Sequence, residues 1–320
     1  MKYTAPIWER KGVTLELNRI KKEPFDIVKC TEHPSYFVAH MLGIVPYKYQ
    51  HMFLRQFAVG EKVPKRLIIC KARQMGFSYF LAFLAIWYAF GNIAKTGMHN
   101  DTKVGIISRS DNQAKKLMAL IQKIIRLSKV NLNFAIDKKS PWNKYELHFT
   151  NGFIKCYPPT DACRGETFDI LIVDEARGVD KEIFVDAMEP TVTAVDGCII
   201  MVSTPRGQKG MFFELFDPDD IYPKHEYKRY WFNWKQSENE IQKRIVAEKL
   251  KIAKATGNMK SFNQEYNAMF TVDEEAFFEN ADIEKGANSE PKLTTQYECK
   301  DLPCSMGVDY GITTAATCIT

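Results

Sequence analysis

The sequence predicts an α/β fold in which helices flank a mostly parallel sheet. Three observations support this prediction. Short apolar strands alternate with helical segments, a glycine-containing loop joins one strand to an apolar helix, and another strand ends in two carboxylates. Strand, helix and strand in succession are typical of βαβ units, whose parallel strands are buried on both faces.

The expected parallel strands are aliphatic or β-branched and show little polar alternation. They span 67–70, 104–108, 170–173 and 198–202. The segment 111–128 follows the second of these strands and places its apolar side chains on one helical face. Thr150-Asn151-Gly152 separates two further strands, and Asn-Gly is a strong hairpin signal. We therefore expect an antiparallel hairpin over 145–157.

The chain changes in character after residue 202. We expect a strand over 226–234 and a capping box that begins at Ser237, followed by a charged helix to about Ala255. Residues 273–300 are acidic and polar, as in a linker, and a new strand begins within 305–320. These changes divide the chain into an N-terminal extension (1–40), a core (41–210), a lid subdomain (211–275), a linker (276–300) and the start of a second domain (301–320).

Composition indicates an ordinary globular protein, with 45% hydrophobic and 26% charged residues. The net charge of +5 is only a weak indication of a nucleic-acid partner. The eight cysteines include no CxxC pair, so we expect reduced thiols rather than a zinc site. The N-terminus has no apolar signal core, and the apolar run 79–90 is shorter than the roughly 20 residues of a membrane span. We expect a soluble, intracellular protein.

The loop at 71–78 has the features of a phosphate-binding loop. Between a strand and a helix, backbone N–H groups and the helix N-terminus can face an anion. Gly76 allows close approach of the backbone to phosphates, and Ser78 is placed to offer its hydroxyl to Mg²⁺. The common pattern GxxxxGKS/T fails twice, because Lys71 stands in place of the first glycine and Phe77 in place of the lysine. Lys71 can still bring its charge from the strand side, unless it is simply a solvated strand end and Ser78 an N-cap.

The strand at 170–173 is followed by Asp174 and Glu175. A parallel strand carries its last residues to the carboxyl edge of the sheet, where the phosphate loop also lies. Asp174 can hold Mg²⁺ there, directly or through water. Glu175 can orient and deprotonate the attacking water. The alternative is an ordinary solvated strand end.

Two other segments belong to the candidate site. Ser203, Thr204 and Pro205 end the next strand, where small hydroxyl residues can sense a γ-phosphate and proline stops the strand. Gln50 lies upstream, and its amide can donate and accept at once, which matches the adenine edge. A plain exit from the strand and a surface glutamine are the alternatives.

These motifs together resemble those of the large terminase subunits of tailed bacteriophages. The phosphate loop resembles the terminase variant that has lysine at its first position and an aromatic residue before the serine. Residues 203–205 resemble the terminase coupling motif, 45–50 the adenine-contacting segment, and 261–270 the segment that leads out of the ATPase domain. The resemblance covers roughly residues 40–320, and its loop motif is Lys71-Ala72-Arg73-Gln74-Met75-Gly76-Phe77-Ser78.

The resemblance implies a RecA-like P-loop NTPase of the additional-strand type that hydrolyses ATP with Mg²⁺. Its implied role is to move double-stranded DNA into a procapsid, with the portal protein, the small terminase subunit and ring-forming copies as partners in the host cell cytoplasm. Asp309 would be the first metal ligand of an RNase-H-like nuclease domain, which we expect to be incomplete here, so that DNA cleavage belongs to a longer protein. A helicase-like remodelling ATPase and a nucleotide-binding scaffold with an inactive loop are the alternatives.

Two arginines are candidates for the residue that stabilises charge on the transferred phosphoryl group. Arg164 precedes the acidic strand in an Arg-Gly element that resembles one found there in terminases, and a neighbouring subunit would receive it. Arg73 lies in the phosphate loop and would act within its own subunit. A third interpretation is that Arg164 only pairs with Glu166 or Asp169 at the surface.

Overall fold

The computed structural model describes residues 11–91, 102–132, 136–137, 142–150, 152–216 and 227–271, together with the backbone of two short strands near the C-terminus. The chain divides into two units, 1–273 and 274–320. In the second unit, β8 (Val308–Asp309) pairs antiparallel with β9 (Cys318–Ile319). The side chain of Asp309 lies outside the described residues, so its predicted nuclease role stays a prediction.

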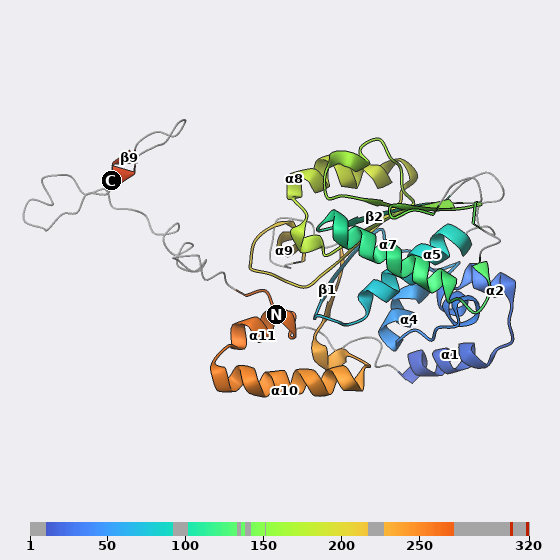
Figure 1. Cartoon of the computed structure of the whole chain (residues 1–320), viewed down its shortest axis with the longest axis horizontal. Coiled ribbons are helices and arrows are strands. Elements are labelled where there is room, and N and C mark those ends of the chain that lie inside the picture. The colour runs from blue at the N-terminus through green and yellow to red at the C-terminus, as the bar shows by residue number, and fades with distance from the viewer. Residues whose placement is uncertain are drawn as a thin grey trace, which may run out of the picture. The chain divides into compact units, whose positions relative to one another are not determined.

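A seven-stranded sheet forms the centre of the first unit (Figure 1). Its order is β3-β4-β2-β5-β6-β1-β7, and each neighbouring pair is parallel except β3 and β4. The predicted hairpin and the mostly parallel sheet are therefore confirmed. The strands are β1 (Arg66–Lys71), β2 (Thr102–Ser108), β3 (Glu146–Phe149), β4 (Gly152–Tyr157), β5 (Ile170–Asp174), β6 (Cys198–Ser203) and β7 (Lys228–Phe232).

Strand β6 lies between β1 and β5, which is the arrangement predicted by the additional-strand fold class. The register sets Cys70 of β1 opposite Ser203 of β6, and Val202 of β6 opposite Asp174 of β5. The three strands are parallel, so their carboxyl ends meet at one edge of the sheet. Segments that are far apart in the sequence thus converge at this edge.

Helices cover both faces of the sheet (Figure 1). On one face, α5 (Phe77–Gly91) packs beside α7 (Asp111–Arg126) and against β2 and β4. The other face carries the short helical segments that follow β5, namely η6 (Ala176–Gly178), α8 (Lys181–Ile183), the π-helix η7 (Phe184–Met188) and η8 (Glu189–Val195), together with α9 (Met211–Phe216). The run 79–90 is therefore a buried core helix, as predicted. In the described part of the chain, no helix combines the length and the apolar character needed to cross a membrane.

The segment expected to be an N-terminal extension packs onto the core from residue 11 onward. It contains α1 (Lys11–Lys22), α2 (Ile27–Glu32), α3 (Pro34–Phe37) and the π-helix η2 (Val38–Leu42), and it leads into α4 (Lys48–Arg55). The indole N–H of Trp87 in α5 donates to the carbonyl of Cys30 at 3.0 Å, and His40 Nε2 lies 2.8 Å from the carbonyl oxygen of Ile20. These contacts attach the N-terminal helices to α5 and to one another.

The region after β6 differs from the sequence prediction in two respects. First, β7 lies within the expected lid yet pairs with β1 in the central sheet. Second, the predicted capping box at Ser237 is wrong, because Asn239 is the N-cap of α10 (Glu240–Thr256) and its side-chain oxygen accepts from the N–H of Gln242 at 3.1 Å. The Ser237 hydroxyl instead donates to the Gln242 amide at 2.6 Å. α11 (Met259–Glu265) follows α10.

An aromatic cluster joins the phosphate loop to the core. Phe77 is buried, and its ring lies 5.0 Å from that of Phe232 and 5.2 Å from that of Tyr49. Phe53 and Phe80 complete the contact. The ring that replaces the usual lysine therefore points into the protein and leaves the loop surface free.

We expect Phe77→Ala to lower the free energy of unfolding by about 3–5 kcal/mol, because it removes a buried ring and leaves a cavity. Tyr79→Ala, two residues away at a position that is 43% exposed, is the matched control and should cost less than about 1 kcal/mol. Urea unfolding measures both values. Equal effects of the two substitutions would show that the Phe77 ring does not hold the loop to the core.

Candidate nucleotide site

The loop between β1 and α5 has two residues in the left-handed region, Gln74 with φ 58° and Gly76 with φ 78°. A Cβ atom at position 76 would lie 3.0 Å from the Tyr49 hydroxyl and 3.4 Å from the Gln50 amide nitrogen. Glycine is needed there both for its φ and for the space. The N–H groups of Tyr79 and Phe80 donate to the Gly76 carbonyl, so α5 begins directly at the loop.

Helix α4 binds two carbonyl groups of this loop. The Tyr49 hydroxyl donates to the carbonyl of Met75, and the Gln50 amide donates to the carbonyl of Gly76 at 2.8 Å. The Gln50 side-chain oxygen accepts from the N–H of Tyr47 at 2.9 Å. Both ends of the Gln50 amide are thus used on backbone groups, and its predicted adenine contact stays a prediction.

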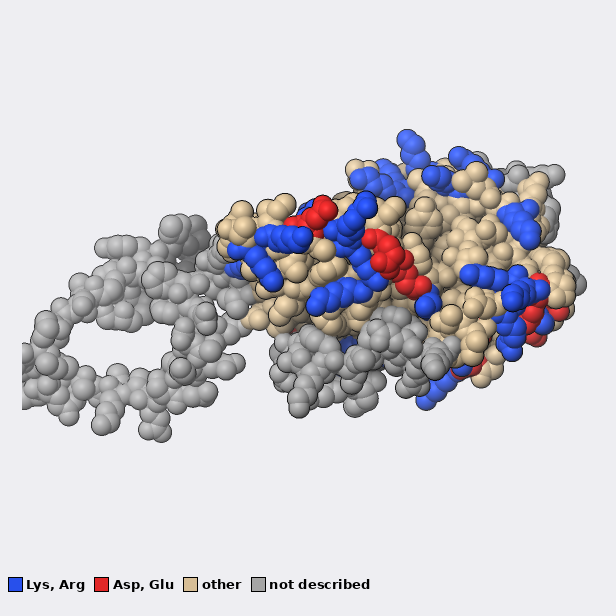
Figure 2. Space-filling model, turned by 90° about the horizontal axis from the view of Figure 1, so that it is seen from below, with Lys and Arg blue, Asp and Glu red and all other residues tan. Residues whose placement is uncertain are grey.

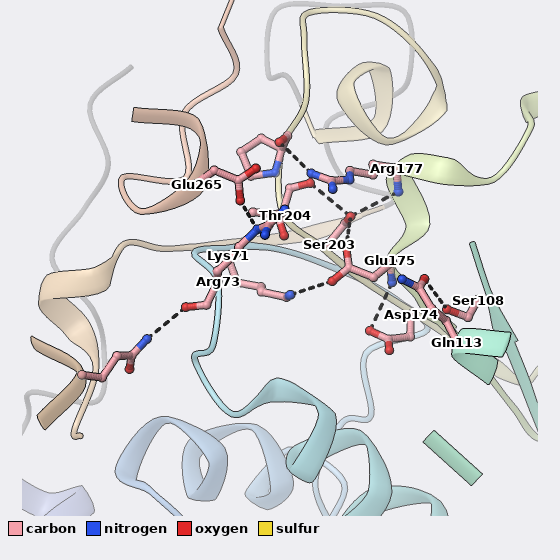
Figure 3. Close-up of polar contacts among 12 residues, drawn as sticks. Lys71, Arg73, Ser108, Gln113, Asp174, Glu175, Arg177, Ser203, Thr204 and Glu265 are labelled. Carbon is pink, nitrogen blue, oxygen red and sulfur yellow. Dashed lines mark hydrogen bonds and ion pairs between the residues drawn. The ribbon is translucent and has the colours of Figure 1, made fainter. Parts of the chain in front are cut away.

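Lys71 ends β1 and reaches across the sheet edge to Glu175 (Figure 3). Its ammonium lies 2.9 Å from Glu175 Oε1, and both side chains are largely shielded from solvent. The interpretation of Lys71 as a solvated strand end is therefore wrong. The residue that sequence reasoning assigned to the phosphates is paired with the residue assigned to the attacking water.

Glu175 follows β5 in the left-handed region, with φ 53°. Its second carboxylate oxygen accepts from the Ser203 hydroxyl at 3.3 Å. Burial by itself would raise the pKa of Glu175, but the Lys71 ammonium, the Arg177 guanidinium and the Ser203 hydroxyl together lower it. Glu175 is therefore held as a charged carboxylate, which is the form a general base requires.

The Asp174 carboxylate has fewer hydrogen bonds and ion pairs than Glu175 to offset the effect of its burial. Its Oδ1 accepts from the N–H of Glu175 at 3.1 Å. Burial raises the pKa of Asp174 to about 6, and the attraction of the Lys71 ammonium offsets only part of this effect. A carboxylate with a raised pKa at a strand end suits a divalent cation, which would stabilise its charged form. Ser78 is exposed at the start of α5, and its predicted role as a ligand of the same ion stays a prediction.

The backbone around Arg73 is tied to the segment after β7. The N–H of Arg73 donates to the Glu265 carbonyl at 2.9 Å, and its carbonyl accepts from the Gln242 amide at 3.0 Å. The Arg73 guanidinium forms an ion pair with the Glu265 carboxylate, as Figure 3 shows. α10 and α11 therefore contact the phosphate loop directly. The Arg73 side chain is therefore paired within its own chain.

The predicted coupling segment meets the acidic strand end. Ser203 and Thr204 are buried, and the Ser203 oxygen accepts from the N–H of Arg177 at 3.3 Å. The Arg177 guanidinium donates to the Pro205 carbonyl, also at 3.3 Å. Sequence reasoning missed Arg177. Its position two residues after Glu175 was the available signal, but only the 3₁₀ turn η6 folds it back over β6.

Arg164 stands apart from these residues. It is exposed at the end of the 3₁₀ turn η5 (Asp161–Cys163), and its N–H donates to the Asp161 carbonyl. Glu166 is paired with Lys155 at 3.1 Å and with the Tyr157 hydroxyl at 2.6 Å. The Asp169 carboxylate accepts from the N–H of Lys103 at 2.7 Å. Neither carboxylate forms an ion pair with Arg164 among the described residues, so the interpretation of Arg164 as their surface partner finds no support.

The structure thus unites Lys71, Asp174, Glu175 and Ser203 at one sheet edge, with Gly76 and Ser78 in the adjoining loop. Ala72 and Met75 are buried and contribute backbone groups. Among the residues described, no cluster of three or more His, Cys, Asp or Glu side chains forms a ready metal site. The predicted metal role of Asp174 and Ser78 stays a prediction.

Comparisons with known proteins agree with this geometry. No family model matches the chain. It is 27% identical over 199 residues to the large terminase subunits of Thermus phage G20c and Thermus virus P23-45, an alignment that covers 57% of this chain. The large terminase ATPase domain of Thermus phage P74-26 superimposes with a TM-score of 0.56 at 22% identity, covering 75% of this chain and 99% of that one. The large terminase of bacteriophage HK97 gives 0.57 at 16% identity over 71% of this chain and 51% of that one.

The chain has the fold of a large terminase ATPase domain. The predicted resemblance to large terminase subunits is confirmed by the curated relatives, and the predicted fold class by the solved structures. The matched region spans 38% of the length of the two curated relatives. Within this fold, β6 lies between β1, which ends in Lys71, and β5, which ends in Asp174.

We expect Asp174→Asn to stabilise the nucleotide-free protein at pH 8 by up to about 2 kcal/mol, because it removes a charge that burial disfavours. The pKa of Asp174 in the folded state is raised above its ordinary value of 3.8, so the charged side chain costs stability as pH rises through about 6. The gain should therefore disappear near pH 4, where aspartic acid is protonated in the folded protein. Urea unfolding at the two pH values measures it.

Glu61→Gln, which changes an exposed carboxylate, is the control for this experiment and should have little effect at either pH. A gain for Asp174→Asn that is the same at pH 4 and pH 8 would contradict the argument, because it would not arise from the ionisation of residue 174.

Proposed function

We propose that this chain is the ATP-hydrolysing motor portion of a viral DNA-packaging protein. The observation that carries the proposal is the Lys71–Glu175 pair at 2.9 Å, which brings a phosphate-loop cation and a candidate general base together under the Ser203 hydroxyl. The terminase ATPase fold supports the same assignment. A relative in structure, the large terminase of a thermophilic bacteriophage, has been solved with ATP-γ-S, at a TM-score of 0.52 and 13% identity.

In the proposed reaction, water attacks the γ-phosphorus of ATP and releases ADP and phosphate. We propose that the Lys71 ammonium turns from Glu175 toward the phosphate oxygens, and that this exchange frees the Glu175 carboxylate. Glu175 then accepts a proton from the attacking water. Asp174 and the Ser78 hydroxyl would hold Mg²⁺, which supplies positive charge to the phosphates when it is bound.

The coupling segment is placed to respond to this exchange. Ser203 donates to Glu175 and accepts from the backbone of Arg177, so a movement of the Glu175 carboxylate changes the bonding of both residues. Arg177 also holds the Pro205 carbonyl, at the exit from β6. Through these contacts the nucleotide state would be passed to the chain that follows β6.

The remaining parts of the proposal concern the whole protein. We propose that it moves double-stranded DNA into a procapsid, assembled as a ring on the portal protein, with the small terminase subunit as a further partner. The reaction would take place in the host cell cytoplasm. Asp309 would belong to a nuclease domain of RNase-H-like type, and DNA cleavage would be an activity of the longer protein.

We expect the purified chain to hydrolyse ATP in the presence of Mg²⁺, and we expect Lys71→Ala to lower turnover at least 100-fold, on the order of the effect of losing one preorganised charge in a site. Lys65→Ala is the matched control, since Lys65 is an exposed lysine just before the other end of β1, paired with Asp196. Phosphate release measures turnover. Near-normal turnover by Lys71→Ala would show that another group supplies the charge.

Arg164 and Arg73 are the two candidates for the arginine that completes the site. Arg164 is exposed, and none of its hydrogen bonds or ion pairs in the described structure reaches the phosphate loop. Arg73 lies in the loop but is paired with Glu265. These contacts support Arg164 as a residue that acts on the site of a neighbouring subunit.

Mixing two inactive variants tests this assignment. Glu175→Gln should bind Mg-ATP but hardly hydrolyse it, and Arg164→Ala should lack the donated arginine, a loss of about 10³–10⁵ in rate. In mixed rings, some sites combine an intact Glu175 with an Arg164 from the neighbour, so activity should partly return. Failure to recover activity in assemblies that demonstrably contain both variants would assign Arg164 to its own subunit.

A further inference from the structure

Helix α10 carries an exposed apolar ridge. Ile241, Ile245 and Ile252 lie on one side of the helix, and their exposed fractions are 64%, 46% and 62%. At 1.5 Å per residue, the ridge is about 16 Å long. The side of α10 that packs inward carries Gln242, Val246 and Ala253 and lies about 100° around the helix from the ridge. A row of three β-branched apolar side chains exposed on a single helix is unusual for a surface that faces water alone.

The same helix is basic. Arg244 and Lys251 are exposed, and among the described residues neither forms an ion pair. The face of the molecule that includes α10 has more blue than red surface in Figure 2, which looks from below. A partner for α10 should therefore combine apolar side chains with carboxylates.

A surface of that kind exists elsewhere on the chain. Glu182, Val185 and Asp186 lie in the helical segment formed by α8 and η7. Glu189 follows at the start of η8, where it pairs with Arg66 at 3.7 Å. Val185 is 44% exposed, and Glu182 and Asp186 are exposed without a side-chain ion pair in the described structure. Figure 1 shows α8 and α10 at opposite ends of the domain, so one copy cannot bring the two surfaces together.

We propose that α10 of one copy of this chain docks against the α8–η7 surface of a second copy. Two different surfaces of the same chain then meet head to tail, which is the heterologous contact from which rings are built. The apolar side chains would form the centre of the interface, and the opposite charges would surround it. This inference rests on the proposed ring assembly and names the surfaces that make it.

The docking also relates Arg164 of one copy to the phosphate loop of the next copy. η5, which precedes Arg164, packs against η7, and the Cys163 thiol donates to the Ala187 carbonyl at 3.5 Å. α10 contacts the phosphate loop through the Gln242–Arg73 bond. Placing η7 of one copy on α10 of the next therefore brings Arg164 to the side of the neighbour that carries its phosphate loop.

Duplex DNA is a rival partner for a basic helix, because phosphates attract lysine and arginine. The isoleucine ridge favours a protein. Phosphate-backbone contacts use charged and polar groups and would leave three apolar side chains without a function. The acidic, partly apolar surface on α8 and η7 also has no role in binding DNA.

The proposed contact is tested by exchanging the charges of the α10 and α8–η7 surfaces. One variant carries Arg244→Glu and Lys251→Glu, a second carries Glu182→Lys and Asp186→Lys, and a third carries all four substitutions. Self-association is measured by sedimentation, with and without Mg²⁺ and a non-hydrolysable ATP analogue. We expect each double variant to associate about tenfold more weakly and the fourfold variant to recover. The matched control is Lys116→Glu with Lys123→Glu, which reverses two exposed charges on α7 and should change nothing.

A second measurement locates the contact. A photoreactive phenylalanine replaces Ile245 in a mixture of isotope-labelled and unlabelled chains, and mass spectrometry identifies the cross-linked peptides. Links between copies to the segment 180–196 would support the proposal. Links within one copy to residues 272–320, links between copies to another surface, or the absence of links between copies would overturn it.

Two further outcomes would also overturn the proposal. One is a fourfold variant that does not recover although it is folded. The other is an α10 double variant that loses affinity for a short DNA duplex while its self-association is unchanged. Sedimentation and cross-linking do not depend on turnover, so an inactive chain would contradict the proposed function and leave this test valid.

Discussion

The Lys71–Glu175 ion pair spans strand β6 and depends on the order of the strands. β1 and β5 are separated by β6, and the parallel register brings all three carboxyl ends to one edge. A lysine side chain is long enough to cross one intervening strand, which is how a lysine at the beginning of the phosphate loop meets a carboxylate from β5. The Ser203 hydroxyl at the end of β6 then lies between them and contacts the same carboxylate. The strand order thus determines which side chains can contact one another at this edge.

The phosphate loop is held from two sides by segments that are distant in sequence. Tyr49 and Gln50 of α4 bind its carbonyl groups, while Glu265 and Gln242 bind the backbone of Arg73. Such contacts keep a loop with two left-handed residues in one conformation, although each hydrogen bond adds only about 1 kcal/mol of net stability. The α4 contacts use carbonyl groups of the loop, whereas the α10–α11 segment also occupies the N–H of Arg73.

Sequence reasoning predicted the elements that are determined by residues close together in the chain. Apolar strands such as 67–70 and 198–202 form where expected, and the Asn-Gly hairpin joins β3 to β4. Pairings between distant segments were harder to predict. β7 was expected within a separate lid, since nothing in its own residues indicates that it pairs with β1. Arg177 was missed for a similar reason, because its partners Ser203 and Pro205 lie on another strand. The Asn239 cap was missed since Ser237 and Glu240 form an equally good local pattern.

The backbone of Glu175 has a consequence for how this protein can be engineered. A residue with a side chain pays about 1–3 kcal/mol to hold φ at 53°, and glycine or asparagine would adopt that conformation more easily. Searches for heat-resistant variants would therefore favour these residues at position 175, and every such gain would remove the carboxylate. Selection for thermal stability would therefore act against catalytic activity at this position. A screen for stability alone would remove the Glu175 carboxylate, which the proposed reaction needs.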